Sequence, residues 1–261
     1  MRRREDTILA TQFANVGYAR LPGIVSQAQL EPLKATLVAV FSDIFPEARS
    51  QLAESFDNPI FDTLVIDKRL KSKEAFGRFY DIIQTNIAVN RLFHDAKLLE
   101  AVAMFLDCSV ERLAWSGSLL RIDVPGDKRN TLGWHQDHHY LPYNEKGRGI
   151  VVTLAISDAW KEMGALNIIE ESHRLGIVVP VKSNNDRFST QQLNVCKDEI
   201  DSKKIKCIET QSGDALFLDM RTFHRSGHNS STKVRWSCIM RFHNSLDTGF
   251  LPFRRIQSVI T

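Results

Sequence analysis

The chain has 261 residues, of which 43% are hydrophobic and 25% charged, and its formal net charge at pH 7 is +3. This composition is typical of a globular protein, and the length suits one domain, which we expect to span residues 1–261. No stretch approaches the roughly 20 apolar residues of a membrane span. Basic residues are interleaved with acidic ones, so neither membrane insertion nor nucleic-acid binding is expected.

The N-terminus and the cysteines together predict a cytoplasmic protein. The opening MRRRED is basic, but the residues after it are too polar for a signal peptide. The cysteines are scattered without a C-x-x-C pair, so we expect reduced thiols and neither disulfides nor a zinc site. They are Cys108, Cys196, Cys207 and Cys238.

The N-terminal part of the chain, about residues 1–112, is predicted to be mainly helical. A short strand at 13–21 precedes a long amphipathic helix within 23–45, which opens with the capping-box pair Ser26 and Gln29 and is closed by Pro46. Further helical periodicity follows at three places, the last of them after Asp95, which is a good N-cap. These helices are expected at 72–85, 88–94 and 96–106.

Beyond this part the hydrophobic period falls towards two, which is typical of strands. Candidate strands are 116–124, the region around His135, 149–157, 165–169, 176–181, 206–211, 214–219 and 233–243. We therefore expect a mainly β core at about 113–245, a sandwich or jelly roll covered by helices on one side. The polar stretch 182–205 is expected to be an insertion, which is either a lid or, as is more common for polar stretches, a solvated loop without a role.

The segment GWHQDHHYLPY at 133–143 carries the first chemical signal. In a strand His135 and Asp137 point to one face and Gln136 to the other. An imidazole and a carboxylate side by side supply two ligands of a 2-His-1-carboxylate iron site. A single H-x-D triplet also arises by chance, so the interpretation requires a third ligand elsewhere in the chain.

The second signal lies at 219–244, where His224 and His228 compete for the role of third ligand. Arg235 follows His224 by eleven positions and shares one face of an alternating run with Ser237. A buried guanidinium beside a hydroxyl suits a carboxylate, which it binds through two parallel hydrogen bonds. The alternative is an ion pair with a nearby acid such as Asp219.

These segments resemble the phytanoyl-CoA dioxygenase family of iron(II)- and 2-oxoglutarate-dependent oxygenases over most of the chain. The resemblance rests on GYARLPGIVSQAQLEPL, WHQDHHYLPY, GALNIIEESHRLG and GDALFLDMRTFHRSGHNSSTKVRWS. The family's pattern of H-x-D, a distant His and an Arg about eleven residues later falls on His135, Asp137, His224 and Arg235. Its Ser-Gly-x-Asn tail matches Ser226, Gly227 and Asn229, which favours His224 over His228. One departure is Glu171, where a Gly normally precedes Ser172.

The resemblance implies a double-stranded β-helix, a cupin-like jelly roll, that holds Fe(II) through His135, Asp137 and His224. It further implies that 2-oxoglutarate meets Arg235, assisted by Ser237 and Ser226, and that O2 is the oxidant. The implied outcome is hydroxylation of a C–H bond in a small or medium-sized metabolite, with release of succinate and CO2. Related halogenases lack the carboxylate ligand, so Asp137 favours oxygenation.

Five residues near these positions are weaker candidates. Gln136 is a candidate contact of the cosubstrate, and Tyr140 and His139 are candidates for the substrate pocket, with a packing role equally plausible for each. Arg121 and Arg241 lie on strands beside the core and are candidates to bind an anionic substrate, although ion-paired or solvated arginines are more common.

Two other functions compete with the oxygenase. The first is another cupin-type metalloenzyme that does not use 2-oxoglutarate, which would need no dicarboxylate clamp at Arg235 and Ser237. The second is a non-catalytic binding module on the same fold, which the complete set of three metal ligands disfavours.

Overall fold

The computed structural model describes residues 2–52, 55–127, 132–140, 148–182, 193–196, 198 and 200–250. Its helices are α1 (Arg2–Val16), α2 (Gln27–Ile44), α3 (Pro59–Lys71), α4 (Lys73–Gln84), α5 (Ile87–Phe93) and α6 (Ala96–Phe105). Its strands are β1 (Tyr18–Leu21), β2 (Leu113–Asp123), β3 (Ile150–Ala155), β4 (Leu166–Ile169), β5 (Val181–Lys182), β6 (Leu193–Asn194), β7 (Ile205–Ile208), β8 (Ala215–Asp219), β9 (His224–Ser226) and β10 (Arg235–Asn244).

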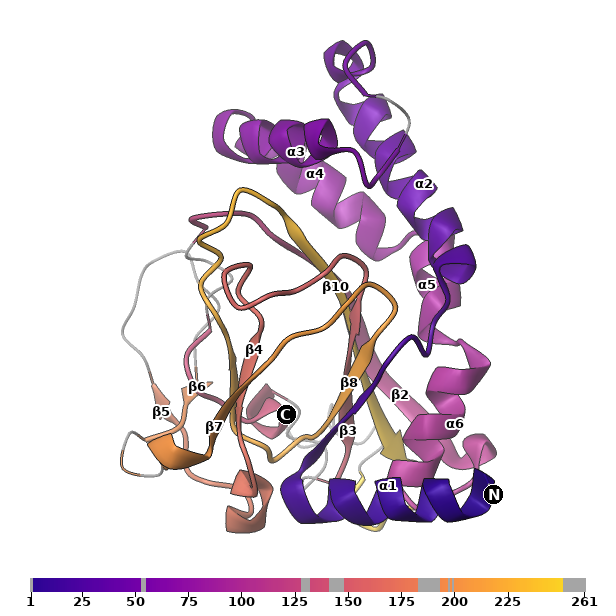
Figure 1. Cartoon of the computed structure of the whole chain (residues 1–261), viewed down its shortest axis with the longest axis vertical. Coiled ribbons are helices and arrows are strands. Elements are labelled where there is room, and N and C mark those ends of the chain that lie inside the picture. Colours follow the sequence, from indigo (N-terminus) through magenta and orange to yellow (C-terminus); the bar gives the residue numbers. More distant parts are fainter. Residues whose placement is uncertain are drawn as a thin grey trace, which may run out of the picture.

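Eight of the described strands form two facing antiparallel sheets, and the helices cover one of them, whereas β5 and β6 pair separately. The larger sheet has the order β1-β8-β3-β10-β2 and the smaller one the order β7-β4-β9. Figure 1 shows helices α2 to α6 along the outer side of the larger sheet, with β4 and β7 on the opposite side of the molecule. This is the mainly β architecture with helices that the sequence predicts, and it confirms the jelly-roll core.

The largest apolar cluster lies between the helices and the larger sheet. Phe41 from α2, Phe61 from α3 and Phe79 from α4 are fully buried, and Phe61 stacks on Trp236 of β10. Burying one such side chain stabilises the fold by about 1.5–3 kcal/mol. Every second side chain of β10 packs into this cluster. Because side chains alternate along a strand, the remaining side chains of β10 point into the space between the two sheets.

The N-terminal helices are close to the predicted ranges, with one correction and one omission. α2 begins at the predicted capping box, and Asp95 caps α6 by accepting hydrogen bonds from two backbone N–H groups. The strand predicted at 13–21 is wrong for its first half, because α1 continues to Val16. Gly17, at φ +87°, then turns the chain into β1. Helix α3 was not predicted.

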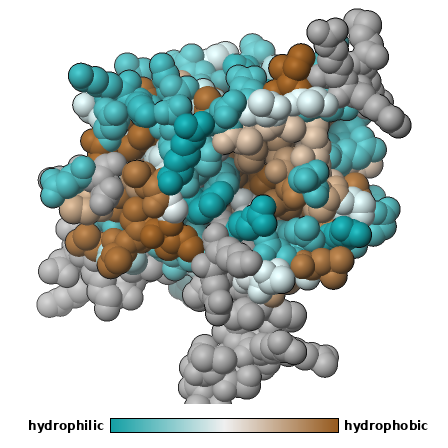
Figure 2. Space-filling model, turned by 90° about the horizontal axis from the view of Figure 1, so that it is seen from below, coloured by the Kyte–Doolittle hydropathy of each residue, from teal (hydrophilic) through white to brown (hydrophobic). Residues whose placement is uncertain are grey.

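Two predicted β segments are also corrected. His135 makes only an isolated bridge and is followed by a 3-10 helix at Asp137–Tyr140. Of 176–181, only Val181 is in a strand, and the segment exposes Ile177, Val179 and Val181. In the view from below, hydrophobic residues form several patches between hydrophilic ones (Figure 2).

Parts of the predicted insertion at 182–205 lie outside the described residues, namely 183–192, 197 and 199. Its described parts include β6 and a 3-10 helix at Ser202–Lys204. The lid role and the single-domain organisation stay predictions. Among the described helices, none combines the length and hydropathy that a membrane span needs. The cytoplasmic location also stays a prediction.

Candidate active site

Three buried side chains from two segments of the chain converge between the two sheets. His135 and His224 face each other through an antiparallel bridge, in which each backbone N–H donates to the other's carbonyl at 3.1 and 3.0 Å. Asp137 follows at the start of the 3-10 helix. One ligand atom from each residue lies within 4.8 Å of the other two, and all three residues are buried. His228, the rival third ligand, is exposed.

The two imidazoles are oriented in a way that fits a metal ion. Nδ1 of His135 lies 2.8 Å from the carbonyl of Gly133, and Nδ1 of His224 lies 2.9 Å from that of Thr222. Because each Nδ1 must donate to its carbonyl, each Nε2 carries the lone pair. Both Nε2 atoms lie 3.4 Å from Oδ1 of Asp137. Two imidazole nitrogens and one carboxylate oxygen are the ligand set of a facial iron triad.

The second oxygen of Asp137 is held by Arg241 of β10. Nε of Arg241 donates to Oδ2 at 2.7 Å, which leaves Oδ1 facing the two histidines. Burial alone would raise the pKa of Asp137, but Arg241 and the two histidines hold that pKa well below its usual range. Burial and the neighbouring His224 lower the pKa of His135. The cluster therefore presents an ionised carboxylate and a neutral imidazole, as metal binding requires.

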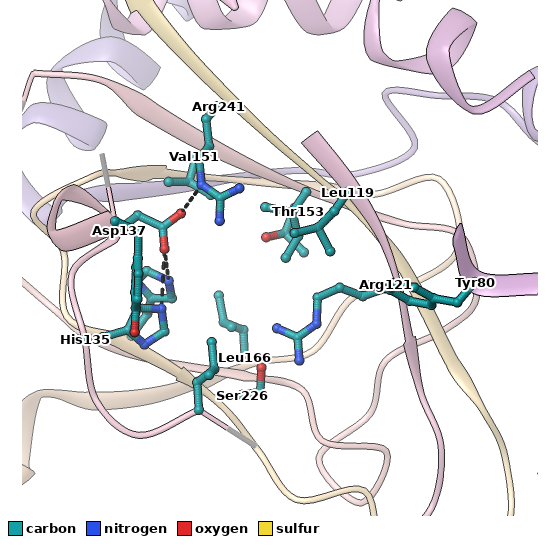
Figure 3. Close-up of a pocket in the computed structure, with 14 residues that line it drawn as sticks. Tyr80, Leu119, Arg121, His135, Asp137, Val151, Thr153, Leu166, Ser226 and Arg241 are labelled. Carbon is teal, nitrogen blue, oxygen red and sulfur yellow. Dashed lines mark hydrogen bonds and ion pairs between the residues drawn. The ribbon is translucent and has the colours of Figure 1, made fainter. Parts of the chain in front are cut away.

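A cavity of about 300 Å³ opens beside this cluster. Figure 3 shows the guanidinium groups of Arg241 and Arg121 directed into it from different sides. Tyr140, predicted to line the substrate pocket, lines it together with both arginines. The remaining described lining is largely apolar and comes from both sheets and from α4: Tyr80, Leu119, Leu132, Val151, Thr153, Leu166, Ser226 and Ile239.

A narrower cavity of about 30 Å³ continues from the first and ends at the predicted carboxylate clamp. Arg235 and Ser237 line only this narrow part, whereas Ser226 and Arg121 line both parts. The structure thus brings Arg235, Ser237 and Ser226 to one end of the same space that the metal cluster borders.

Arg235 has a carboxylate partner inside the protein, and it is not the predicted Asp219. Nε and Nη2 of Arg235 donate to Oδ2 of Asp123 at 3.2 and 2.7 Å, and Nη1 donates to the carbonyl of Gly164. Asp219 pairs with Arg221 instead. Each Nη nitrogen carries two hydrogens and uses one of them here, so Arg235 retains donors for a ligand.

Two of the predicted site residues do not line the described cavity. The Gln136 amide is fully buried, donates to the carbonyls of Gly176 and Arg221, and accepts from the N–H of Val178. Its predicted contact with the cosubstrate is therefore wrong, because backbone groups occupy its polar atoms. His139 likewise bonds to the carbonyl of Val178.

Sequence reasoning also missed two residues of this region. Asp123 links the two arginines of the narrow cavity, and its place two positions after Arg121 on one strand face was the available signal. Tyr80 reaches the cavity from α4, which helical periodicity alone does not indicate. Burial raises the pKa of its phenol.

A sequence model of the phytanoyl-CoA dioxygenase (PhyH) family matches residues 13–237. The chain belongs to the phytanoyl-CoA dioxygenase family. It is accordingly an oxidoreductase, a dioxygenase that depends on iron and 2-oxoglutarate, and the cluster of His135, Asp137 and His224 fits an iron ion. Neither rival function, a cupin enzyme without 2-oxoglutarate or a non-catalytic module, is supported. No curated protein matches the sequence significantly.

Solved structures of similar fold include several iron and 2-oxoglutarate proteins. The epimerase SnoN in complex with Fe3+, alpha ketoglutarate and nogalamycin RO is 14% identical, over 93% of this chain and 84% of SnoN, with a TM-score of 0.62. EvdO2 from Micromonospora carbonacea var. aurantiaca, complexed with 2-oxoglutarate, is 19% identical over 90% and 89%, with a TM-score of 0.56. The carbocyclase SnoK from nogalamycin biosynthesis is 14% identical over 90% and 82%, with a TM-score of 0.60.

Proposed function

We propose that His135, Asp137 and His224 hold the iron of this dioxygenase, and that the enzyme hydroxylates a C–H bond of a small or medium-sized molecule. The observation that carries the proposal is the convergence of two Nε2 atoms and Oδ1 at the wall of a cavity. Backbone carbonyls at both Nδ1 atoms and Arg241 at Oδ2 set this orientation before any metal binds. Such preorganised ligands lose little conformational freedom on binding.

The chemistry balances with one molecule each of O2, 2-oxoglutarate and substrate. O2 would be the oxidant, and bound iron would let it take two electrons from 2-oxoglutarate and two from the substrate C–H bond. One oxygen atom ends in the succinate that forms with CO2, and the other ends in the new hydroxyl group. The protein binds, orients and excludes water. Asp137 occupies the carboxylate position whose loss is associated with halogenation, so we propose hydroxylation.

At the narrow end we propose that Arg235, Ser237 and Ser226 bind the distal carboxylate of 2-oxoglutarate. All three line the narrow cavity, and each has less than a tenth of its surface exposed. A charge-assisted pair that is shielded from water is stronger than the same pair on a surface. Asp123 fixes the orientation of the guanidinium from the other side.

In the wider part we propose a compact substrate between apolar walls. A cavity of about 300 Å³ lies at the small end of ligand sites, and 2-oxoglutarate must share it. The ring of Tyr140 stands edge-on to the ring of His135, with 5.7 Å between their centroids, so it forms the wall next to the metal cluster. An epimerase and a carbocyclase are among the proteins of similar fold, so the oxidative outcome needs a direct test.

The test is succinate release from 2-oxoglutarate, measured with Fe(II) and O2 across a panel of compact metabolites, followed by mass analysis of the product. We expect one panel member to stimulate succinate formation and to gain one oxygen atom. His135→Ala should abolish both signals, whereas His228→Ala, which removes an exposed imidazole, should keep them. Stimulated turnover that survives His135→Ala would disprove the ligand assignment. A product that loses two hydrogens instead would disprove hydroxylation.

A further inference from the structure

The described lining of the two cavities contains three arginines, of which Arg241 lies closest to the metal ligands. Asp137 is the only acidic side chain among the described residues that line the two cavities. The charges of Arg121 and Arg235 face one shared carboxylate, that of Asp123. Arg241 has a different carboxylate partner, Asp137, and it shares this partner with the proposed iron.

The contacts of Arg241 show where its positive charge is available. Its Nε donates to Oδ2 of Asp137, and among the described residues neither Nη atom has a hydrogen-bond partner. The side chain keeps only 17% of its surface, and this surface faces the cavity (Figure 3). Two Nη groups side by side form a planar fork that matches a carboxylate. A buried guanidinium with unused donors is costly until an anion meets it.

Space for such an anion exists next to the fork. Arg241 is paired in register with Gly117 of β2, which has no side chain on the inner face. A Cβ added to Gly117 would meet nothing within 4 Å, so no side chain fills the space opposite the backbone of Arg241, and the Arg241 side chain itself lines the cavity of about 300 Å³. On its other side Arg241 is paired with Val151 of β3, whose side chain is part of the apolar cavity wall.

This place is separate from the proposed 2-oxoglutarate clamp. Arg235 lines only the narrow cavity and Arg241 only the wide one. The two arginines are six residues apart on β10, which corresponds to about 20 Å along an extended strand. The strand thus presents one arginine at each end of its inner face.

We propose that the substrate of this oxygenase carries a carboxylate, and that the Nη groups of Arg241 bind it in the wide cavity next to the metal ligands. The inference rests on the proposed oxygenase function and adds the chemical class of its substrate. An anion at Arg241 lies beside Asp137, so the oxidised carbon lies close to the carboxylate and not at a remote chain end. Arg241 then has two tasks, because Nε orients a metal ligand and the Nη groups anchor the substrate.

The experiment compares acids with amides of the same carbon skeleton. Protein loaded with Mn(II) and 2-oxoglutarate without O2 is titrated with acetate, propionate and butyrate and with their primary amides, and the rise in Tm gives relative affinities. We expect the best acid to bind at least tenfold more tightly than its amide. Arg241→Met should remove this preference, and Arg241→Lys should keep part of it. Arg112→Met removes an exposed arginine outside both cavities and should leave the preference unchanged.

Any of the following results would overturn the proposal. If no acid stabilises the wild-type protein, or if acid and amide bind equally, the substrate is not a carboxylate, and this comparison stands even if Arg241→Met fails to fold. An acid preference that persists in Arg241→Met means that the metal binds the acid. A tenfold loss of 2-oxoglutarate affinity in Arg241→Met, with acid binding unchanged, assigns Arg241 to the cosubstrate. Failure of the oxygenase assignment looks different, because wild-type protein would then show no Tm shift with Mn(II) and 2-oxoglutarate.

Discussion

Replacing Asp123 by Asn tests how the protein stabilises two arginines inside the narrow cavity. Oδ1 of Asp123 accepts from Nη2 of Arg121 at 2.8 Å, and Oδ2 accepts from Arg235 at 2.7 and 3.2 Å. Burial would raise the pKa of Asp123, but the two guanidinium groups lower it below its usual range. The carboxylate is therefore ionised, and Asp123→Asn removes the negative charge that the two buried guanidinium groups share.

The expected loss of stability is large for a change of one atom type. Removing one partner of a buried ion pair costs about 3–5 kcal/mol, and the retained amide oxygen places Asp123→Asn near the lower end, about 3 kcal/mol. Urea unfolding of the metal-free protein at pH 7 measures this free energy. Because the pKa of Asp123 is lowered on folding, its contribution exists above the unfolded pKa, near 3.9, and disappears as the pH falls through the folded pKa. The difference between variant and wild type should therefore shrink in acid.

The same variant reports on cosubstrate binding. With Asp123 neutral, the distal carboxylate of 2-oxoglutarate becomes the only anion for Arg235, so binding should tighten by about tenfold. Saturating 2-oxoglutarate with Mn(II) would then stabilise the variant by about 1.4 kcal/mol more than the wild type. Asp127→Asn is the matched control, since it breaks a mostly buried ion pair with Arg69 that lines neither cavity. A loss below 1 kcal/mol, or equal stabilisation of variant and wild type by 2-oxoglutarate, would refute the reasoning.

Three further predictions concern the metal, the clamp and pH. His224→Ala should lose Fe(II) in equilibrium dialysis while His228→Ala keeps it; the reverse result would assign the third ligand to His228. Arg235→Leu should raise the KM for 2-oxoglutarate at least tenfold, as expected for a lost charge-assisted contact of about 1.5–3 kcal/mol, and an unchanged KM would exclude the clamp. Burial lowers the pKa of His243 to about 4 in the folded protein, whereas the pKa of this side chain in the unfolded chain is near 6.5. Between these two pH values the unfolded chain therefore binds a proton at His243 that the folded chain does not bind. Stability should fall by about 2 kcal/mol from pH 7 to pH 5, and His243→Gln should flatten this slope in urea titrations at each pH.

The sequence predicts most accurately which side chains of a strand face the core and which face the cavity, because this follows from simple alternation along the strand. The run 233–243 was divided into two faces, and β10 follows that division. Trp236, Cys238 and Phe242 are in the core against the helices, while Arg235 and Ser237 line the cavity. The three metal ligands follow from spacing and from the family resemblance, because each ligand has a fixed place in the order of the motif.

Contacts between distant segments account for the errors. The alternating pattern correctly predicts that the side chain of Gln136 points away from those of His135 and Asp137. It does not predict the hydrogen-bond partners of Gln136, which lie 40, 42 and 85 residues further along the chain. The partner of Arg235 is set by the register of β10 on β2, which places Asp123 opposite it. Asp219 was the nearer acid in sequence, yet it is bonded to Arg221, two residues away. Neither pairing has a local signature in the chain.

The inner face of β10 explains how one strand can serve two anions without mixing them. Arg235, Ser237, Ile239 and Arg241 alternate along it, so a hydroxyl and an aliphatic side chain separate the two guanidinium groups. Each arginine is also tied to its own aspartate, Asp123 at one end and the metal ligand Asp137 at the other. An arginine fixed by a carboxylate on one edge presents its remaining donors in one direction only. If the two aspartates orient the two arginines in this way, removing the positive charge at one end should lower the affinity for one ligand and leave the affinity for the other unchanged. The separate 2-oxoglutarate and acid titrations of Arg235→Leu and Arg241→Met measure that independence directly.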